Sequence, residues 1–273
     1  MVYLGLILFT RFGEGKEDTM KIAAINGSPK GRESITHVMV RSFLQGAERA
    51  GAETVTVFLA EKDIRHCRGC MACWFKTPGK CIIDDDDMAE ILSQTEGADV
   101  VVWATPLKYA NVSSMLKVFV ERLLVFANPF ILVDPAGETR HPKKAPGAES
   151  SFYRAKLVAI ANGGLGQRGH FQVLSHWMQR LARNNLTEVI GEIYAPQGPL
   201  LANPPDELRP VIADYLRLLE KSGAEIVTDG AISAETQTLL DRDLIPEDIY
   251  LQQINSYFKM LLSSVKHPYV NSW

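Results

Sequence analysis

Residues 21–36, KIAAINGSPKGRESIT, are the stretch that most restricts the fold of this chain. The run from Lys21 to Ile25 is mainly apolar and ends abruptly at Asn26-Gly27-Ser28-Pro29, which predicts a buried strand followed by a tight loop. From Ser34 onward, apolar residues recur at helical spacing, namely Ile35, Val38, Met39, Phe43 and Ala47. A strand therefore feeds a hydroxyl-rich loop, and that loop feeds a helix.

The alternation of strand and helix continues along the rest of the chain. Apolar runs predict further strands at 53–59, 98–104, 156–161 and 186–194. Helical patterns follow at 84–92, 113–126, 171–183, 206–223 and 246–264. Five strands alternating with helices predict an α/β fold of three layers, with a parallel sheet between helices. A ligand-binding loop on the first strand favours the flavodoxin-like strand order 2-1-3-4-5.

We divide the chain into three parts on this basis. Residues 1–19 form an N-terminal extension to which we assign no function, and residues 20–200 form the α/β domain. That domain includes a cysteine-rich loop at 66–81 and a Pro- and Gly-rich excursion at 127–155. Residues 201–273 are expected to be a helical extension packed on the domain.

Composition narrows the range of functions. A formal net charge of −3 argues against binding to nucleic acid through phosphate contacts. No apolar run approaches the roughly 18 residues that a membrane span requires. Residues 2–9 are apolar but precede the charged residues, the reverse of a signal peptide. We therefore expect a cytoplasmic protein.

The loop at 26–36 has the chemistry of an anion site. It matches neither the G-x-G-x-x-G nor the G-x-x-x-x-G-K-[ST] nucleotide motif. A helix N-terminus attracts anions, and Ser28, Ser34 and Thr36 add hydroxyl donors. These features suit the phosphomonoester of FMN, although the same residues could simply cap the helix.

Two later loops could complete a flavin site, because they also follow strands of the predicted sheet. Pro106 and Tyr109 can supply a flat wall, and Asn111 can bond the edge of a flavin ring. Asn162-Gly163-Gly164 follows the fourth strand, where glycines allow backbone to approach a planar ring. Each loop is unspecific alone, but three on neighbouring strand ends indicate a flavin.

At this point the sequence resembles the NADPH-dependent FMN reductase family of flavodoxin-like proteins. The similar segments are 26–36, the cysteine segment 67–73, Cys81 with 85–88, Thr-Pro-Leu-Lys-Tyr at 105–109, and 117–122. The resemblance spans roughly residues 20–195 and implies bound FMN, NAD(P)H as electron donor and a homodimer or higher homo-oligomer. The FMN-contacting residues that it implies, together with the loop residues above, are Ser28, Lys30, Ser34, Thr36, Pro106, Leu107, Tyr109, Asn111, Asn162, Gly163 and Gly164.

All four cysteines of the chain lie between positions 67 and 81. Cys67, Cys70 and Cys73 have C-x2-C-x2-C spacing, and Cys81 follows nearby, a pattern that resembles a [4Fe–4S] site more than the separated pairs of structural zinc sites. The resemblance supports this interpretation, because related iron–sulfur flavoproteins carry a similar compact motif. Free thiols at the flavin edge and a zinc site are the two alternatives.

The sequence thus predicts an oxidoreductase that passes electrons from NAD(P)H through FMN to a quinone, flavin or protein acceptor, with the cysteines as a candidate iron–sulfur site. No side chain is assigned as a catalytic acid or base, because the flavin itself carries the redox chemistry. A non-enzymatic electron carrier and a zinc-stabilised protein on the same fold are the alternatives.

Overall fold

Five parallel strands form one sheet in the order β2-β1-β3-β6-β7 in the computed structural model, which describes residues 19–142 and 155–263. The strands are β1 (Lys21–Asn26), β2 (Glu53–Phe58), β3 (Val100–Pro106), β6 (Lys156–Asn162) and β7 (Val189–Ala195). Because β6 and β7 are the fourth and fifth of these strands along the chain, the predicted order 2-1-3-4-5 is confirmed.

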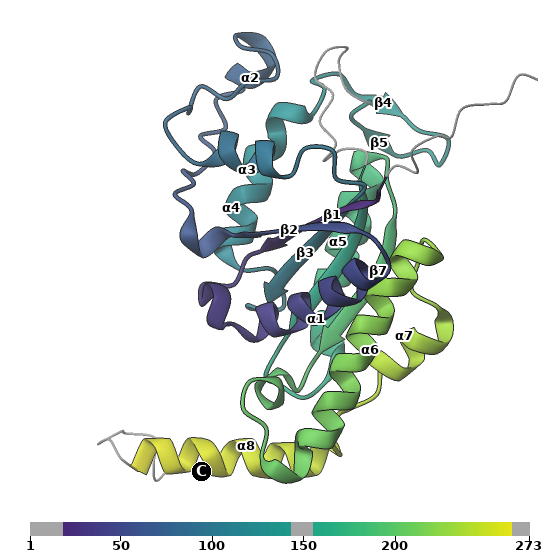
Figure 1. The fold of residues 1–273 in the computed structure, drawn as a ribbon. Coiled ribbons are helices and arrows are strands. Elements are labelled where there is room, and N and C mark those ends of the chain that lie inside the picture. Colours follow the sequence, from purple (N-terminus) through teal and green to yellow (C-terminus); the bar gives the residue numbers. More distant parts are fainter. Residues whose placement is uncertain (1–18, 143–154, 264–273) are drawn as a thin grey trace, which may run out of the picture.

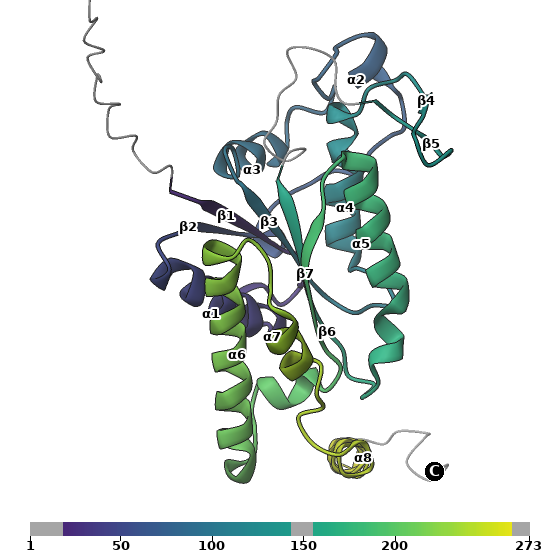
Figure 2. The same ribbon diagram turned by 90° about the vertical axis from the view of Figure 1, so that its right-hand side faces the viewer.

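Helices cover both faces of this sheet (Figures 1 and 2). One face carries α1 (Ile35–Arg49), α6 (Arg209–Thr228) and the short helix α7 (Ala234–Leu240). The other carries α3 (Met88–Gln94), α4 (Ser114–Arg122) and α5 (Gln172–Asn185). The helix α7 was not predicted from the sequence.

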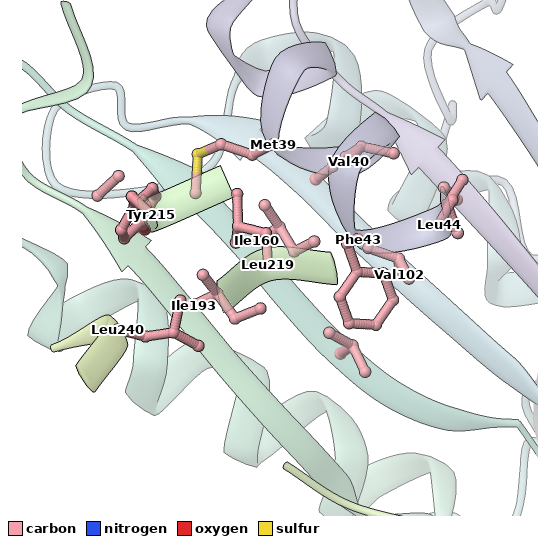
Figure 3. Packing of buried hydrophobic residues seen from close by; sticks show 14 of the residues in the cluster. Met39, Val40, Phe43, Leu44, Val102, Ile160, Ile193, Tyr215, Leu219 and Leu240 are labelled. Atoms are coloured by element: carbon pink, nitrogen blue, oxygen red, sulfur yellow. The ribbon is translucent and has the colours of Figure 1, made fainter. Parts of the chain in front are cut away.

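The core between α1, α6 and the sheet is densely packed (Figure 3). Phe43 of α1, Leu219 of α6 and Ile160 of β6 are each fully buried there. Two glycines allow the helices to cross closely, since a Cβ on Gly46 would lie 1.8 Å from the Glu220 carbonyl oxygen. A Cβ on Gly223 would likewise lie 1.9 Å from the Phe43 carbonyl oxygen. The helix α6, which follows β7, is therefore an integral part of one layer.

Several elements lie outside the layers. The cysteine-rich loop contains the single turn α2 (Ala72–Phe75), and the excursion contains the strand pair β4 (Leu132–Val133) and β5 (Thr139–Arg140). Residues 143–154 of the predicted excursion and 1–18 of the predicted extension lie outside the described residues. The last helix, α8 (Glu247–Ser263), projects from the body (Figure 1). Within the described ranges, no helix is long and apolar enough to cross a membrane.

Candidate functional site

The three loops predicted to bind flavin meet at one edge of the sheet. They follow β1, β3 and β6, which are neighbours in the sheet, at the carboxyl ends where ligands bind in such folds. Hydrogen bonds join them directly: Gly27 N donates to Ala104 O at 2.8 Å, and Leu107 N donates to Asn162 O at 2.7 Å. Asn162 Nδ2 also donates to Thr36 Oγ1 at 2.7 Å, with both residues buried. The structure therefore brings two of the predicted site residues, from distant parts of the chain, into contact.

The predicted anion-binding residues of the loop after β1 are of two kinds: one caps a helix, and the others have unused donors. Ser34 caps α1, because its Oγ accepts from His37 N at 3.0 Å and donates to Gly31 O at 2.6 Å. Ser28 is also buried, but within the described residues its hydroxyl donates no hydrogen bond. Its Oγ accepts one long hydrogen bond, of 3.4 Å, from Lys30 N. Lys30 itself is exposed. Ser28 and Lys30 thus keep donors available for a ligand, whereas Ser34 fixes the start of the helix.

One buried donor in this loop is unpaired among the residues that the structure describes. Asn26 is fully buried, and its Oδ1 accepts from Ser28 N at 2.9 Å. Its Nδ2 makes no hydrogen bond within the described part of the chain. An unpaired buried amide is costly, and a ligand oxygen would remove that cost.

The loop after β3 forms a tight turn that the sequence did not predict. Lys108 and Asn111 exchange backbone hydrogen bonds of 2.8 and 2.9 Å, and the two residues between them, Tyr109 and Ala110, have φ of 47° and 60°. Two consecutive positive φ values define the mirror-image hairpin turn that normally contains Asn or Gly. Tyr109 is consequently fully exposed at the tip of the turn. Asn111 Oδ1 accepts from Val112 N at 2.8 Å, so part of its amide is occupied locally.

A pocket lies between this turn and the loop after β1. Its volume is about 510 Å³, within the usual range for small-molecule sites. Pro29 forms one side, Lys108 and Tyr109 belong to the turn, and Met115 and Lys117 come from α4. The pocket combines apolar walls with the ammonium groups of Lys108 and Lys117, of which Lys117 also pairs with Glu121.

The glycine loop after β6 is held by its carbonyl groups. Gly163 O accepts from Gly198 N at 2.9 Å, and Gly164 O accepts from the Tyr250 hydroxyl at 2.9 Å. The N–H groups of Gly164 and Leu165 have no partner among the described residues, and both residues are exposed. This loop therefore presents two backbone donors to a ligand.

The other three cysteines of the chain lie near Cys73. Burial raises the pKa of the Cys73 thiol, and the charges of Cys81, Cys67 and Cys70 raise it further. Cys70 is exposed and the other three are partly buried. No three His, Cys, Asp or Glu side chains of residues 19–142 and 155–263 are close enough to hold one metal ion. The loop thus gathers four soft donors without forming a preassembled metal site.

A buried ion pair anchors both ends of the cysteine loop. Arg122 of α4 pairs with Asp86, and each side chain is 1% exposed. Arg122 also donates to Arg65 O at 2.9 Å, just before Cys67, and to Ile83 O at 3.0 Å, just after Cys81. Burial opposes ionisation of Asp86, but hydrogen bonds from Arg122 and from backbone N–H groups hold its pKa below the usual range. No sequence pattern links Asp86 to Arg122, because the acidic run at 84–87 stands at the start of a helical pattern with nothing to mark its partner.

The fold and the loops at its carboxyl edge define a flavodoxin-like α/β protein. The profile of the NADPH-dependent FMN reductase family matches residues 20–198. This chain belongs to the NADPH-dependent FMN reductase family, as the resemblance predicted.

Curated relatives are named iron–sulfur flavoproteins. One from Methanocaldococcus jannaschii is 39% identical over 104 residues, which is 38% of this chain and 51% of the relative. Another, from Methanosarcina thermophila, is 33% identical over 119 residues, which is 43% of this chain and 60% of the relative. The chain thus spans about half the length of the curated relatives it matches.

Solved structures share the fold at low sequence identity. An FMN-dependent NADH-azoreductase from Bacillus anthracis, in complex with FMN, matches with a TM-score of 0.54 and 16% identity, covering 77% of this chain and 100% of that one. An NAD(P)H:quinone oxidoreductase from Methanothermobacter marburgensis matches with a TM-score of 0.53 and 12% identity, covering 76% and 97%. At these identities the likeness establishes the fold.

Proposed function

We propose that this protein is an FMN-dependent oxidoreductase that takes electrons from NAD(P)H and delivers them to a quinone, flavin or protein acceptor. The observation that carries the proposal is the convergence of three donor-bearing loops at the carboxyl edge of β1, β3 and β6. Family membership and the names of the similar proteins support the same activity.

The residues of the first loop suit the phosphate of FMN. Ser28 would donate its unused hydroxyl hydrogen, and Lys30 would contribute an exposed ammonium group. Thr36 Oγ1 accepts from Asn162, which leaves its own hydrogen free to donate. Ser34 would act indirectly, by fixing the N-terminus of α1 toward the anion.

The other two loops would hold the ring. Pro106 and Leu107 are partly buried between the first and third loops, and Gly164 and Leu165 offer N–H groups to ring oxygens. A Cβ at Gly163 would lie 3.1 Å from Phe171, so a larger residue there would shift the loop. FMN, when bound, supplies hydride acceptance and electron release, and the protein orients and tunes it.

We further propose that the cysteines bind a [4Fe–4S] cluster. Cys67, Cys70, Cys73 and Cys81 supply the four thiolate donors that such a cluster requires. The names of the curated relatives support this assignment. The ion pair of Arg122 with Asp86 would hold both ends of the ligand loop in place.

An anaerobic titration of the FMN-loaded protein with NADPH, and separately with NADH, tests the activity. We expect one equivalent of at least one nucleotide to bleach the flavin absorption, and an added quinone to restore it. If FMN binds but neither nucleotide reduces it, the protein is an electron carrier and the proposal is wrong. Light scattering after size exclusion tests the expected homodimer in the same preparation.

A further inference from the structure

The part of the chain that follows the family-defining region 20–198 contacts the glycine loop after β6. Tyr250 lies in the first turns of α8, beyond the 20–198 region that defines the family. Its ring is 1% exposed, and its hydroxyl donates to Gly164 O at 2.9 Å. The contact joins residues 86 positions apart in the sequence.

The fit around this contact is close. Gly166 has a φ of +84°, and a Cβ there would lie 3.2 Å from Tyr250 Cδ1. The chain just before α8 is also fixed, because the buried side chain of Gln197 pairs with the backbone of Ile245. Gln197 Nε2 donates to Ile245 O at 2.9 Å, and Ile245 N donates to Gln197 Oε1 at 3.1 Å. The position of Tyr250 is thus set from both sides.

These bonds determine which backbone groups the loop leaves for a ligand. The carbonyl oxygens of Asn162, Gly163 and Gly164 accept from Leu107 N, Gly198 N and the Tyr250 hydroxyl. The peptide unit that joins Gly164 to Leu165 is therefore held at its carbonyl oxygen by Tyr250. The N–H groups of Gly164 and Leu165, which are unpartnered in the described ranges, remain available.

We propose that Tyr250 is a positioning residue of the flavin site, which orients the glycine loop so that its free N–H groups face the pyrimidine edge of FMN. This inference rests on the proposed function, because it assumes FMN at the carboxyl edge of the sheet. It extends the site to a helix that lies outside the segment defining the family.

Tyr250→Phe removes only the hydroxyl, and the exposed Tyr257 on the same helix provides the matched control Tyr257→Phe. Gly164 is exposed, so water can replace the lost hydrogen bond and the Phe variant is expected to fold. We expect Tyr250→Phe to weaken FMN binding about three- to tenfold, the size of one net hydrogen bond, while Tyr257→Phe binds like wild type.

Two further readouts separate positioning from a general structural effect. Hydrogen exchange of the Gly163 and Gly166 amides, which donate to Ala195 O at 2.9 Å and to Pro196 O at 3.4 Å, should quicken in Tyr250→Phe alone, with the thermal midpoint close to wild type. The reduction potential of the bound FMN should fall, because donors at the pyrimidine edge stabilise the charge of the reduced ring. Equal affinity and equal potential in Tyr250→Phe and wild type would overturn the inference. Failure of the wild-type protein to bind FMN would instead overturn the proposed function.

Discussion

Asp86 and Arg122 form an ion pair in which each side chain is only 1% exposed. Arg122 comes from α4, whereas Asp86 comes from the segment that follows the cysteine loop. Through the carbonyls of Arg65 and Ile83, the same guanidinium holds the two ends of that loop. This buried ion pair therefore helps to attach the candidate cluster site to the α/β domain, together with the hydrogen bond that Trp74 Nε1 donates to Leu124 O at 3.1 Å.

Breaking this pair should be costly. Removal of one partner leaves an uncompensated buried charge, so we expect Arg122→Gln to lower the free energy of unfolding by about 3–5 kcal/mol. Arg209→Gln is the control, because the Arg209–Asp206 pair is 71% and 83% exposed and should contribute less than about 1 kcal/mol. Urea denaturation measures both values. Equal, small losses in the two variants would contradict the assigned role of the buried pair.

Ser28 and Ser34 should respond differently to removal of the hydroxyl. Ser34→Ala deletes the N-cap of α1 and should lower the free energy of unfolding by about 0.5–2 kcal/mol. Ser28→Ala deletes a donor unused by the described residues, and should weaken FMN binding about tenfold with a smaller change in stability. Denaturation and flavin-fluorescence titration of both variants check the contrast. A stronger loss of FMN affinity in Ser34→Ala would reverse our division of roles.

The crossing of α1 and α6 depends on Gly46. A Cβ there would overlap the Glu220 carbonyl at 1.8 Å, and backbone cannot move aside cheaply. We expect Gly46→Ala to cost at least the roughly 1–3 kcal/mol typical of overpacking. Gly169→Ala is the control, since no atom of the described residues lies within 4 Å of its Cβ position. A thermal midpoint of Gly46→Ala equal to that of wild type would show that the helices do not cross as described.

Glu225 should make part of the stability dependent on pH. Burial opposes its ionisation, but hydrogen bonds from Ser233 N–H and from the Thr236 and Ser233 hydroxyls lower its pKa from the usual 4.5. Because the folded-state pKa is the lower one, this stabilisation is complete above the unfolded-state pKa and is lost as the pH falls through the folded-state pKa. The difference in unfolding free energy between wild type and Glu225→Gln should therefore shrink as the pH falls below about 4.5. Denaturation at a series of pH values tests this, and a difference that grows toward acid would have the wrong sign.

The sequence predicted the layers because apolar periodicity marks the alternating strands and helices. It predicted the sheet order because the composition of the loop after the first strand favours a flavodoxin-like fold. Runs such as Val100–Ala104 are buried on both faces, and the abrupt ends at Asn26 and Asn162 mark the carboxyl edge of the sheet. The turn at Tyr109-Ala110 was missed, because both residues adopt positive φ without the Gly or Asn that normally signals it.

The long-range polar contacts could not be predicted in the same way. Asp86 and Arg122 are 36 positions apart, and Gly164 and Tyr250 are 86 apart. Each pairing depends on how helices pack after the sheet has formed, and the helix α7 is placed by the same packing. The position of a polar residue in a single sequence does not indicate which distant residue it will contact.

The visible spectrum of anaerobically purified protein, with iron, sulfide and zinc quantified on the same sample, tests the central claim most directly. We predict flavin bands together with a broad absorption that dithionite bleaches, and about four iron and four sulfide per chain. Flavin bands without iron would support the proposed FMN site and contradict the proposed cluster. A colourless protein that cannot be reconstituted with FMN would contradict the whole account.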